Sequence, residues 1–161
     1  MVLSCEEKQP RQFERISPSQ SGVHFNNRIH ESDTLNLLTF EYLYNGGGVG
    51  VGDFNNDNQV DVFFSGNMVS SELYLNRGNF KFQNVTAESG LTTSSWCTGI
   101  SVADVNADGW LDVYVSTVHP HPRKSSPNLL FINKGVNKEG IPLFEERGQE
   151  SGLDDRSYTT H

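Results

Sequence analysis

Two short acidic stretches hold the residue types best suited to chemistry in this chain. Residues 53–61 and 104–112 both follow the pattern D-x-N-x-D-x-x-x-D without a gap, and they lie 51 residues apart. Alternating Asp and Asn side chains along a tight loop would turn several oxygen atoms toward one point. The candidate ligands are Asp53, Asn55, Asp57, the carbonyl of Gln59 and Asp61 in the first loop, and Asp104, Asn106, Asp108, the carbonyl of Trp110 and Asp112 in the second.

These ligands are hard oxygen atoms with no His or Cys among them, which favours one Ca²⁺ in each loop. Mg²⁺ fits less well because it demands a strict octahedron and keeps its waters. The sixth position needs a sharp turn, for which Gly109 is suited and Asn58 is the next-best residue type. The loops are not EF-hands, because their twelfth positions are Phe64 and Val115 instead of Glu. A solvated hairpin without metal is the alternative, which two copies in register disfavour.

The composition excludes several classes of protein. The 161 residues include 20 acidic and 12 basic ones, for a net charge of −8. They contain no basic cluster, so the electrostatic footprint of a nucleic-acid-binding protein is missing. The longest apolar run, residues 129–132, is far shorter than the ~20 residues of a membrane span. The two loops contain six Asp and no Lys or Arg, so they supply −6 of the net charge of −8. The net acidity therefore reflects the predicted metal sites and does not indicate a basic partner.

Both loops belong to a longer repeat. Segments on either side of each loop recur in the same order, and the additional residues of the second copy fall in turn-like segments. Such order indicates a repeated supersecondary unit. The matching segments are residues 48–52 with 99–103, 60–64 with 111–115, 73–78 with 130–135, and 88–91 with 150–153.

Each copy contains four short runs rich in Val, Phe and Tyr and bounded by Gly and Asn, as is typical of strands. Four antiparallel strands in a unit of about 40–50 residues predict an all-β fold built from β-propeller blades. In the first copy the runs are residues 48–54, 60–65, 72–76 and 81–85. The predicted divisions are residues 1–11 (disordered N-terminus or anchor), 12–45 (N-terminal strand and lead-in segment), 46–91 (blade 1), 92–153 (blade 2) and 154–161 (start of a third blade).

Two blades are fewer than the four to eight of a closed propeller, and they would leave exposed sheet edges. We therefore expect these 161 residues to be the N-terminal part of a larger protein. The rest of the same polypeptide, or self-association, would complete the propeller. Residues 13–16 resemble the predicted outer strand 82–85, and we expect them to form the outer strand of another blade.

A family resemblance rests on the sequence Val-Gly-Val-Gly-Asp-Phe-Asn-Asn-Asp at residues 49–57 and Val-Ala-Asp-Val-Asn-Ala-Asp-Gly at residues 102–109. Both resemble the FG-GAP or VCBS-type repeat of integrin α-subunit propellers and many bacterial surface proteins. Residues 33–48 resemble the start of large bacterial VCBS-repeat proteins, which often carry an ASPIC/UnbV domain. The resemblance implies calcium and an extracellular or bacterial cell-surface location. Asn58 in place of the usual loop Gly departs from the pattern, as does the lack of a third loop.

The loops and the resemblance lead to one functional hypothesis, a calcium-binding extracellular module for binding or adhesion at a cell surface. A protein or glycan ligand would contact the variable loops at residues 66–71, 116–128 and 136–142. The alternatives are a non-catalytic scaffold of a carbohydrate-active surface enzyme and a structural spacer. We expect no catalytic residues, because no G-x-S-x-G or H-E-x-x-H motif occurs. His119 and His121 could bind a transition metal, but an ordinary exposed loop is the favoured interpretation.

The two cysteines are interpreted differently. Cys5 follows Leu3-Ser4 and precedes a polar run, which resembles the lipidated cysteine of a bacterial outer-membrane lipoprotein. A lipid on Cys5 would be the only membrane contact, and an incidental cysteine is the alternative. Cys97 lies in an apolar stretch and is expected to be a small buried core residue.

Overall fold

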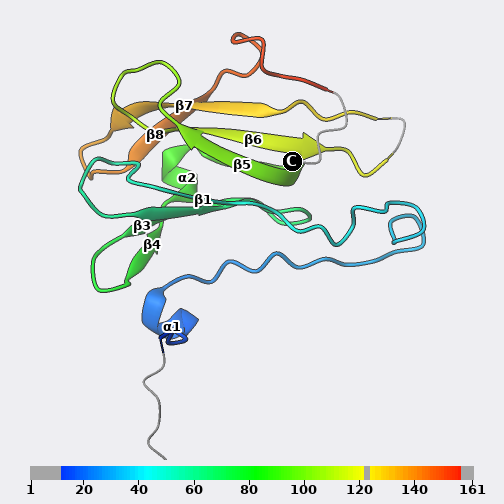
Figure 1. Ribbon diagram of the computed structural model, residues 1–161, viewed down its shortest axis with the longest axis horizontal. Coiled ribbons are helices and arrows are strands. Elements are labelled where there is room, and N and C mark those ends of the chain that lie inside the picture. The colour runs from blue at the N-terminus through cyan, green and yellow to red at the C-terminus, as the bar shows by residue number, and fades with distance from the viewer. Residues whose placement is uncertain (1–11, 122–123, 157–161) are drawn as a thin grey trace, which may run out of the picture.

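The computed structural model describes residues 12–121 and 124–156, and these form two four-stranded antiparallel sheets (Figure 1). Blade 1 has the strand order β1-β2-β3-β4, and blade 2 has the order β5-β6-β7-β8. This arrangement confirms the predicted all-β fold with two blade-like repeats. The strands are β1 (Val49–Gly52), β2 (Asp61–Phe64), β3 (Glu72–Asn76), β4 (Phe82–Asn84), β5 (Trp96–Ala103), β6 (Asp112–Val118), β7 (Leu129–Val136) and β8 (Pro142–Glu146).

The strand register places the two acidic loops at equivalent hairpins. In blade 1, Gly52 pairs with Asp61 across the β1–β2 hairpin, and in blade 2, Ala103 pairs with Asp112 across the β5–β6 hairpin. Each loop therefore joins the first strand of its blade to the second. The last aspartate of the loop is also the first residue of the second strand.

Among the described residues there are also two single-turn helices, α1 (Pro18–Ser21) and α2 (Thr86–Ser89). Both end at a glycine in the left-handed conformation, with φ of 80° at Gly22 and 75° at Gly90. Such a residue is favoured there because glycine has no Cβ to clash with the backbone. No helix in the described part of the chain is long and apolar enough to span a membrane.

The main core lies between the two sheets. Glycines on β1 allow the blades to approach closely, because side chains of β5 occupy the space where their Cβ atoms would lie. Cys97 is fully buried in this core, as predicted. The core residues are Phe54, Phe63, Leu73, Leu75, Val85, Leu91, Cys97, Val113, Val115, Phe131 and Ile141.

The N-terminal segment, residues 12–48, runs along blade 1 without forming a strand (Figure 1). Phe25 stacks on Phe64 with ring centroids 5.1 Å apart, and Phe40 meets Trp96 edge-on at 5.1 Å. Residues 13–16 thus have no strand partner among the described residues, and their place in another blade stays a prediction. Cys5 and residues 157–161 lie outside the described residues.

Candidate metal sites in the two carboxylate loops

The backbone follows the same path in both loops. The fourth position is left-handed in each, with φ of 55° at Asn56 and 58° at Ala107, and so is the sixth, with 66° at Asn58 and 88° at Gly109. The predicted sharp turn at the sixth position is therefore present in both copies. Asn tolerates this conformation because its short polar side chain can hydrogen-bond locally.

The first aspartate of each loop accepts hydrogen bonds from the loop's own backbone. In loop 1, residues 53–61, Asp53 accepts from the amides of Asp57 at 3.0 Å and Asn58 at 2.7 Å. In loop 2, residues 104–112, Asp104 accepts from the amides of Asp108 at 3.1 Å and Gly109 at 2.9 Å. These bonds curl each loop around its first carboxylate.

The middle positions repeat the same pairing. Asn55 donates from Nδ2 to Asp57 at 3.0 Å, and Asn106 donates from Nδ2 to Asp108 at 2.9 Å. Asp57 also accepts from the amide of Gln59 at 2.9 Å, and Asp108 accepts from the amide of Trp110 at 3.0 Å. Hydrogen bonds thus link the third, fifth and seventh positions of each loop.

The ninth aspartate is buried in both blades and joins the loop to the third strand. Asp61 accepts from the amides of Phe54 at 3.0 Å and Asn76 at 2.8 Å. In blade 2, Asp112 accepts in the same way from the amides of Val105 at 2.9 Å and Asn133 at 2.8 Å.

Sequence reasoning missed the two asparagines on the third strand. Asn133 is fully buried; its Nδ2 donates to the carbonyls of Phe54 at 2.8 Å and Leu111 at 3.2 Å, and its Oδ1 accepts from the amide of Gly135 at 3.0 Å. Asn76 makes the matching local bonds in blade 1. The signal was present in the sequence, because Asn-Arg-Gly at 76–78 recurs as Asn-Lys-Gly at 133–135.

Burial, and to a smaller extent neighbouring carboxylates, affect the titration of the last aspartate of loop 1. Burial raises the pKa of Asp61 to about 6. The amides of Asn76 and Phe54 oppose this rise by hydrogen bonding to the charged form, whereas the nearby charges of Asp57 and Asp53 add to it. A cation placed among these carboxylates would favour their ionised forms.

One side-chain oxygen of loop 1 is buried without a hydrogen-bond partner in the described chain, which bears on whether the loop fits a divalent cation. Asn55 Oδ1 is buried and has no hydrogen-bond partner among the described residues. The equivalent oxygen of Asn106 instead accepts from the amide of Asp108 at 3.0 Å. A buried amide oxygen without a partner is costly, and at the third position of the predicted ligand set this oxygen is of the type that Ca²⁺ binds.

The carboxylates themselves are not gathered around one point in this geometry. Within residues 12–121 and 124–156, no three His, Cys, Asp or Glu side chains lie close enough together to hold one metal ion. The loop carboxylates face backbone amides instead. A shared cation would therefore also need the amide oxygens and backbone carbonyls of the predicted ligand set.

The two loops contact each other across the blade interface. Asn56 Nδ2 donates to the carbonyl of Gly109 at 3.1 Å, and Asn55 Nδ2 donates to the carbonyl of Gly140 at 3.2 Å. Residues 136–142, expected to present a recognition surface, are thus partly engaged in holding loop 1, and Ile141 is buried in the core. Loop 1 is therefore supported by both blades.

Residues 66–71, also expected in the recognition surface, are likewise largely structural. Asn67 is buried and donates from Nδ2 to the carbonyls of Cys97 at 2.7 Å and Gly46 at 3.2 Å. Its Oδ1 accepts from Asn27 Nδ2 at 2.6 Å. Ser71 is buried and lies 2.6 Å from the hydroxyl of Thr93.

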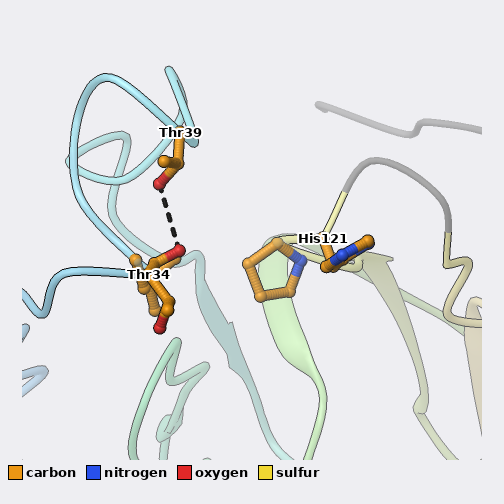
Figure 2. Close-up of a pocket in the computed structure, with 5 residues that line it drawn as sticks. Thr34, Thr39 and His121 are labelled. Carbon is orange, nitrogen blue, oxygen red and sulfur yellow. Dashed lines mark hydrogen bonds between the residues drawn. The ribbon is translucent and has the colours of Figure 1, made fainter.

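A separate groove of about 530 Å³ lies between the N-terminal segment and the loop that follows β6, at the end of β6 away from loop 2 (Figure 2). Thr39 donates to the carbonyl of Thr34 at 3.3 Å along one wall. His119 Nδ1 accepts from the amide of His121 at 3.0 Å, so this nitrogen is engaged within the loop.

The comparisons with known proteins agree with this geometry. Residues 53–115 match the family model described as an FG-GAP-like repeat, and this stretch runs from the first residue of loop 1 through loop 2 into β6. The curated proteins contain no match to the chain. The two equivalent four-stranded sheets and a match that spans both acidic loops agree in assigning an FG-GAP-like repeat to residues 53–115.

Proposed function

We propose that each carboxylate loop binds one Ca²⁺ and that the chain is a calcium-stabilised repeat module of a β-propeller, which binds a protein or glycan at an extracellular surface. The observation that carries the metal proposal is the buried, unpartnered Asn55 Oδ1 inside a loop whose hydrogen bonding is repeated in blade 2. The repeat match supports the propeller-type module.

The residues that would hold the ion are those predicted from the pattern. In loop 1 they are Asp53, Asn55, Asp57, the carbonyl of Gln59 and Asp61, with the equivalent positions in loop 2. A bound Ca²⁺ supplies positive charge among three carboxylates that otherwise repel one another. The chain's own backbone amides hold Asp53 and Asp61 in place before binding, which reduces the ordering cost of binding.

Terbium luminescence tests the metal proposal. Trp110 is the seventh residue of loop 2 and can sensitise a bound Tb³⁺ on excitation, whereas the aromatic residue inside loop 1 is Phe54. We expect sensitised emission that Ca²⁺ displaces and that Asp104→Ala combined with Asp108→Ala removes. Trp110→Phe is the matched control, which should lose the emission but keep Ca²⁺ binding by calorimetry. A folded chain that shows neither emission nor calorimetric binding would contradict the proposal.

The surface-binding part of the proposal needs a separate measurement. The described residues that line the groove beside Thr34, Thr39 and His121 (Figure 2) include none from either loop, so metal would act on it through the stability of the blades. Glycan-array and protein pull-down binding should depend on Ca²⁺ and fall in the Asp104→Ala/Asp108→Ala variant. If glycan or protein binding is equally strong in Ca²⁺ and in chelator, the proposed dependence of ligand binding on the metal is contradicted.

A further inference from the structure

The sequence contains one Asn-Gly pair, Asn45-Gly46, in the turn that precedes β1. The side-chain carbon of an asparagine can be attacked by the backbone nitrogen of the next residue, and a glycine has no side chain to block that approach. Asn45 is exposed, and its backbone amide donates to the carbonyl of Tyr42 at 3.1 Å. The pair therefore combines the residue types of a deamidation site with access to water.

Neither reacting group of this pair is held in place. The side-chain amide of Asn45 and the backbone amide of Gly46 have no hydrogen-bond partner among the described residues. Gly46 has φ of 78°, and nothing lies within 4 Å of the position that its Cβ would take. The Asn45 side chain can therefore turn toward the Gly46 nitrogen without breaking a hydrogen bond.

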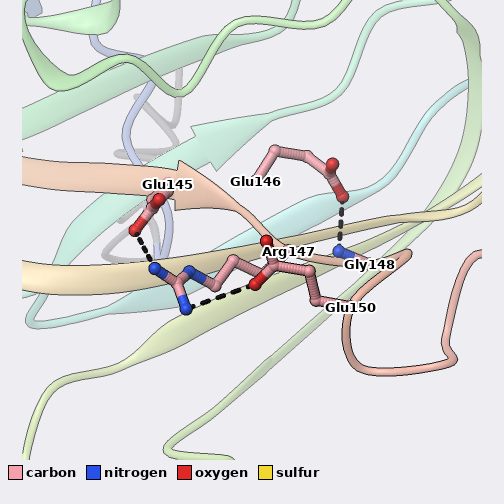
Figure 3. A network of polar contacts seen from close by, with 5 residues as sticks. All are labelled: Glu145, Glu146, Arg147, Gly148 and Glu150. Atoms are coloured by element: carbon pink, nitrogen blue, oxygen red, sulfur yellow. Dashed lines mark hydrogen bonds and ion pairs between the residues drawn. The ribbon is translucent and has the colours of Figure 1, made fainter.

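Two other turn glycines show the opposite arrangement. Asn76 Oδ1 accepts from the amide of Gly78 at 2.9 Å. Figure 3 shows the second case, in which Glu146 Oε1 accepts from the amide of Gly148 at 2.7 Å. An amide held in this way must give up its hydrogen bond before its nitrogen can react. Gly46 has no such restraint.

The chain also contains one Asp-Gly pair, Asp108-Gly109 in loop 2, which could form the same kind of ring. Both of its reacting groups are held. The amide of Gly109 donates to Asp104 at 2.9 Å, and the carboxylate of Asp108 accepts from the amide of Trp110 at 3.0 Å. The fold thus restrains this pair and leaves Asn45-Gly46 unrestrained.

We propose that Asn45 is a site of spontaneous deamidation in the folded protein. The Gly46 nitrogen loses its proton and attacks Cγ of Asn45, and the new N–C bond closes a succinimide ring. The Cγ–Nδ2 bond breaks, and Nδ2 takes up the proton and leaves as ammonia. Water then opens the ring at either of its two carbonyls, which gives aspartate or isoaspartate. Water is the only co-reactant, and the reaction does not depend on calcium or ligand binding.

Isoaspartate at this position has a structural cost, because the backbone that follows is fixed on blade 1. Asn67 Nδ2 donates to the carbonyl of Gly46 at 3.2 Å, and the Gly48 amide donates to Ser65 Oγ at 2.6 Å. The carbonyl oxygen of Ser65 also fills the space beside Gly47. Isoaspartate routes the main chain through the former side chain and lengthens it. The Gly46 carbonyl then moves away from Asn67, and the N-terminal segment loses one attachment to blade 1.

Peptide mapping of the full chain during storage in mildly alkaline buffer measures the reaction. Ion exchange separates the product by its added negative charge, and isoaspartyl methyltransferase labels isoaspartate. We expect deamidation of Asn45 in the folded chain to be less than about tenfold slower than in urea, because folding holds neither reacting group. Isomerisation at Asp108-Gly109 should be at least about tenfold slower in the folded chain than in urea.

Arg77→Asn is the matched control, since it places a second asparagine before a glycine at an exposed turn position. Gly78 has φ of 81°, close to the 78° of Gly46, but its amide is held by Asn76. The pair made by Arg77→Asn should deamidate at least about tenfold more slowly than Asn45. Asn45→Gln should stop the reaction at position 45 while keeping an amide side chain, because glutamine has to close a larger ring.

Two outcomes would overturn the proposal. One is deamidation of Asn45 that is at least about tenfold slower in the folded chain than in urea, and the other is an equal rate at Asn45 and at the Arg77→Asn site. If Arg77→Asn fails to fold by circular dichroism, the comparison of folded chain with urea still decides. The purified isoaspartate form should unfold at a lower urea concentration than the unmodified chain. An unchanged midpoint would contradict the loss of the contact between Gly46 and Asn67.

Discussion

Replacing Asn133 by alanine should destabilise the protein more than any other change to the loop supports. Its side chain makes three hydrogen bonds in a fully buried position, to the carbonyls of Phe54 and Leu111 and from the amide of Gly135. A buried hydrogen bond contributes about 1 kcal/mol, and a buried group left unpaired costs more, so the expected loss is about 3–4 kcal/mol. The bond to Phe54 also crosses between the blades, so the loss should weaken their docking.

Asn76→Ala is the matched control in blade 1. Asn76 is only half-buried, and its side chain bonds to the carbonyl of Val60 and the amide of Gly78 within the same blade. Its removal should cost about 1–2 kcal/mol. Urea unfolding followed by circular dichroism gives both values, and a two-state fit with an unchanged slope makes them comparable. Equal losses in the two variants would refute the argument that Asn133 joins the blades.

Three further predictions follow from the loops and the core. Saturation of one Ca²⁺ site at 100 times its dissociation constant should add about 2.7 kcal/mol to the free energy of unfolding, measured with and without chelator. The double variant Asp104→Ala/Asp108→Ala should lose the contribution of one site. Ala107→Gly should stabilise the calcium-free chain by about 1 kcal/mol, because Ala107 has φ of 58°. Cys97 should resist alkylation in the folded protein, because burial raises the pKa of its thiol.

Each of these has an outcome that would count against it. If the urea midpoint is the same in saturating Ca²⁺ and in chelator, the stabilising role of the metal is contradicted. For Ala107→Gly, Ala103→Gly in the adjoining strand is a control that should destabilise instead, since glycine weakens a strand. Peptide mapping that finds Cys97 modified as quickly in buffer as in urea would show that the core is open to the reagent in the folded protein.

The strands could be predicted because their information is local. Short runs of Val, Phe and Tyr between Gly and Asn specify hairpins, and the 51-residue repeat shows which runs are equivalent. The left-handed turn at Asn58 was also predictable, since few residue types tolerate it. The sequence therefore predicted the position of both carboxylate loops at the first hairpin of each blade.

The supports of those loops could not be predicted because they are tertiary. Asn133 is an ordinary strand residue until blade 1 brings the carbonyl of Phe54 against it. The contact of Gly140 with Asn55 joins residues 85 positions apart, and no pattern within either segment indicates it. Residues 13–16 show the opposite limit: their strand-like pattern pairs with no strand among the residues that the structure describes, and a strand needs such a partner to form.

Asn67 has a consequence for the order in which the chain folds. Its side chain bonds to Gly46, to Cys97 of the second sheet and to Asn27 of the N-terminal segment, partners 21, 30 and 40 residues away. Each sheet can form from neighbouring hairpins, whose contacts are close in sequence and therefore fast to make. Asn67 can form all of these hydrogen bonds only after both sheets have folded and the N-terminal segment has packed against them. Its side-chain amide is thus a probe for the last step of folding, and protection of that amide from hydrogen exchange should develop after the protection of the strands.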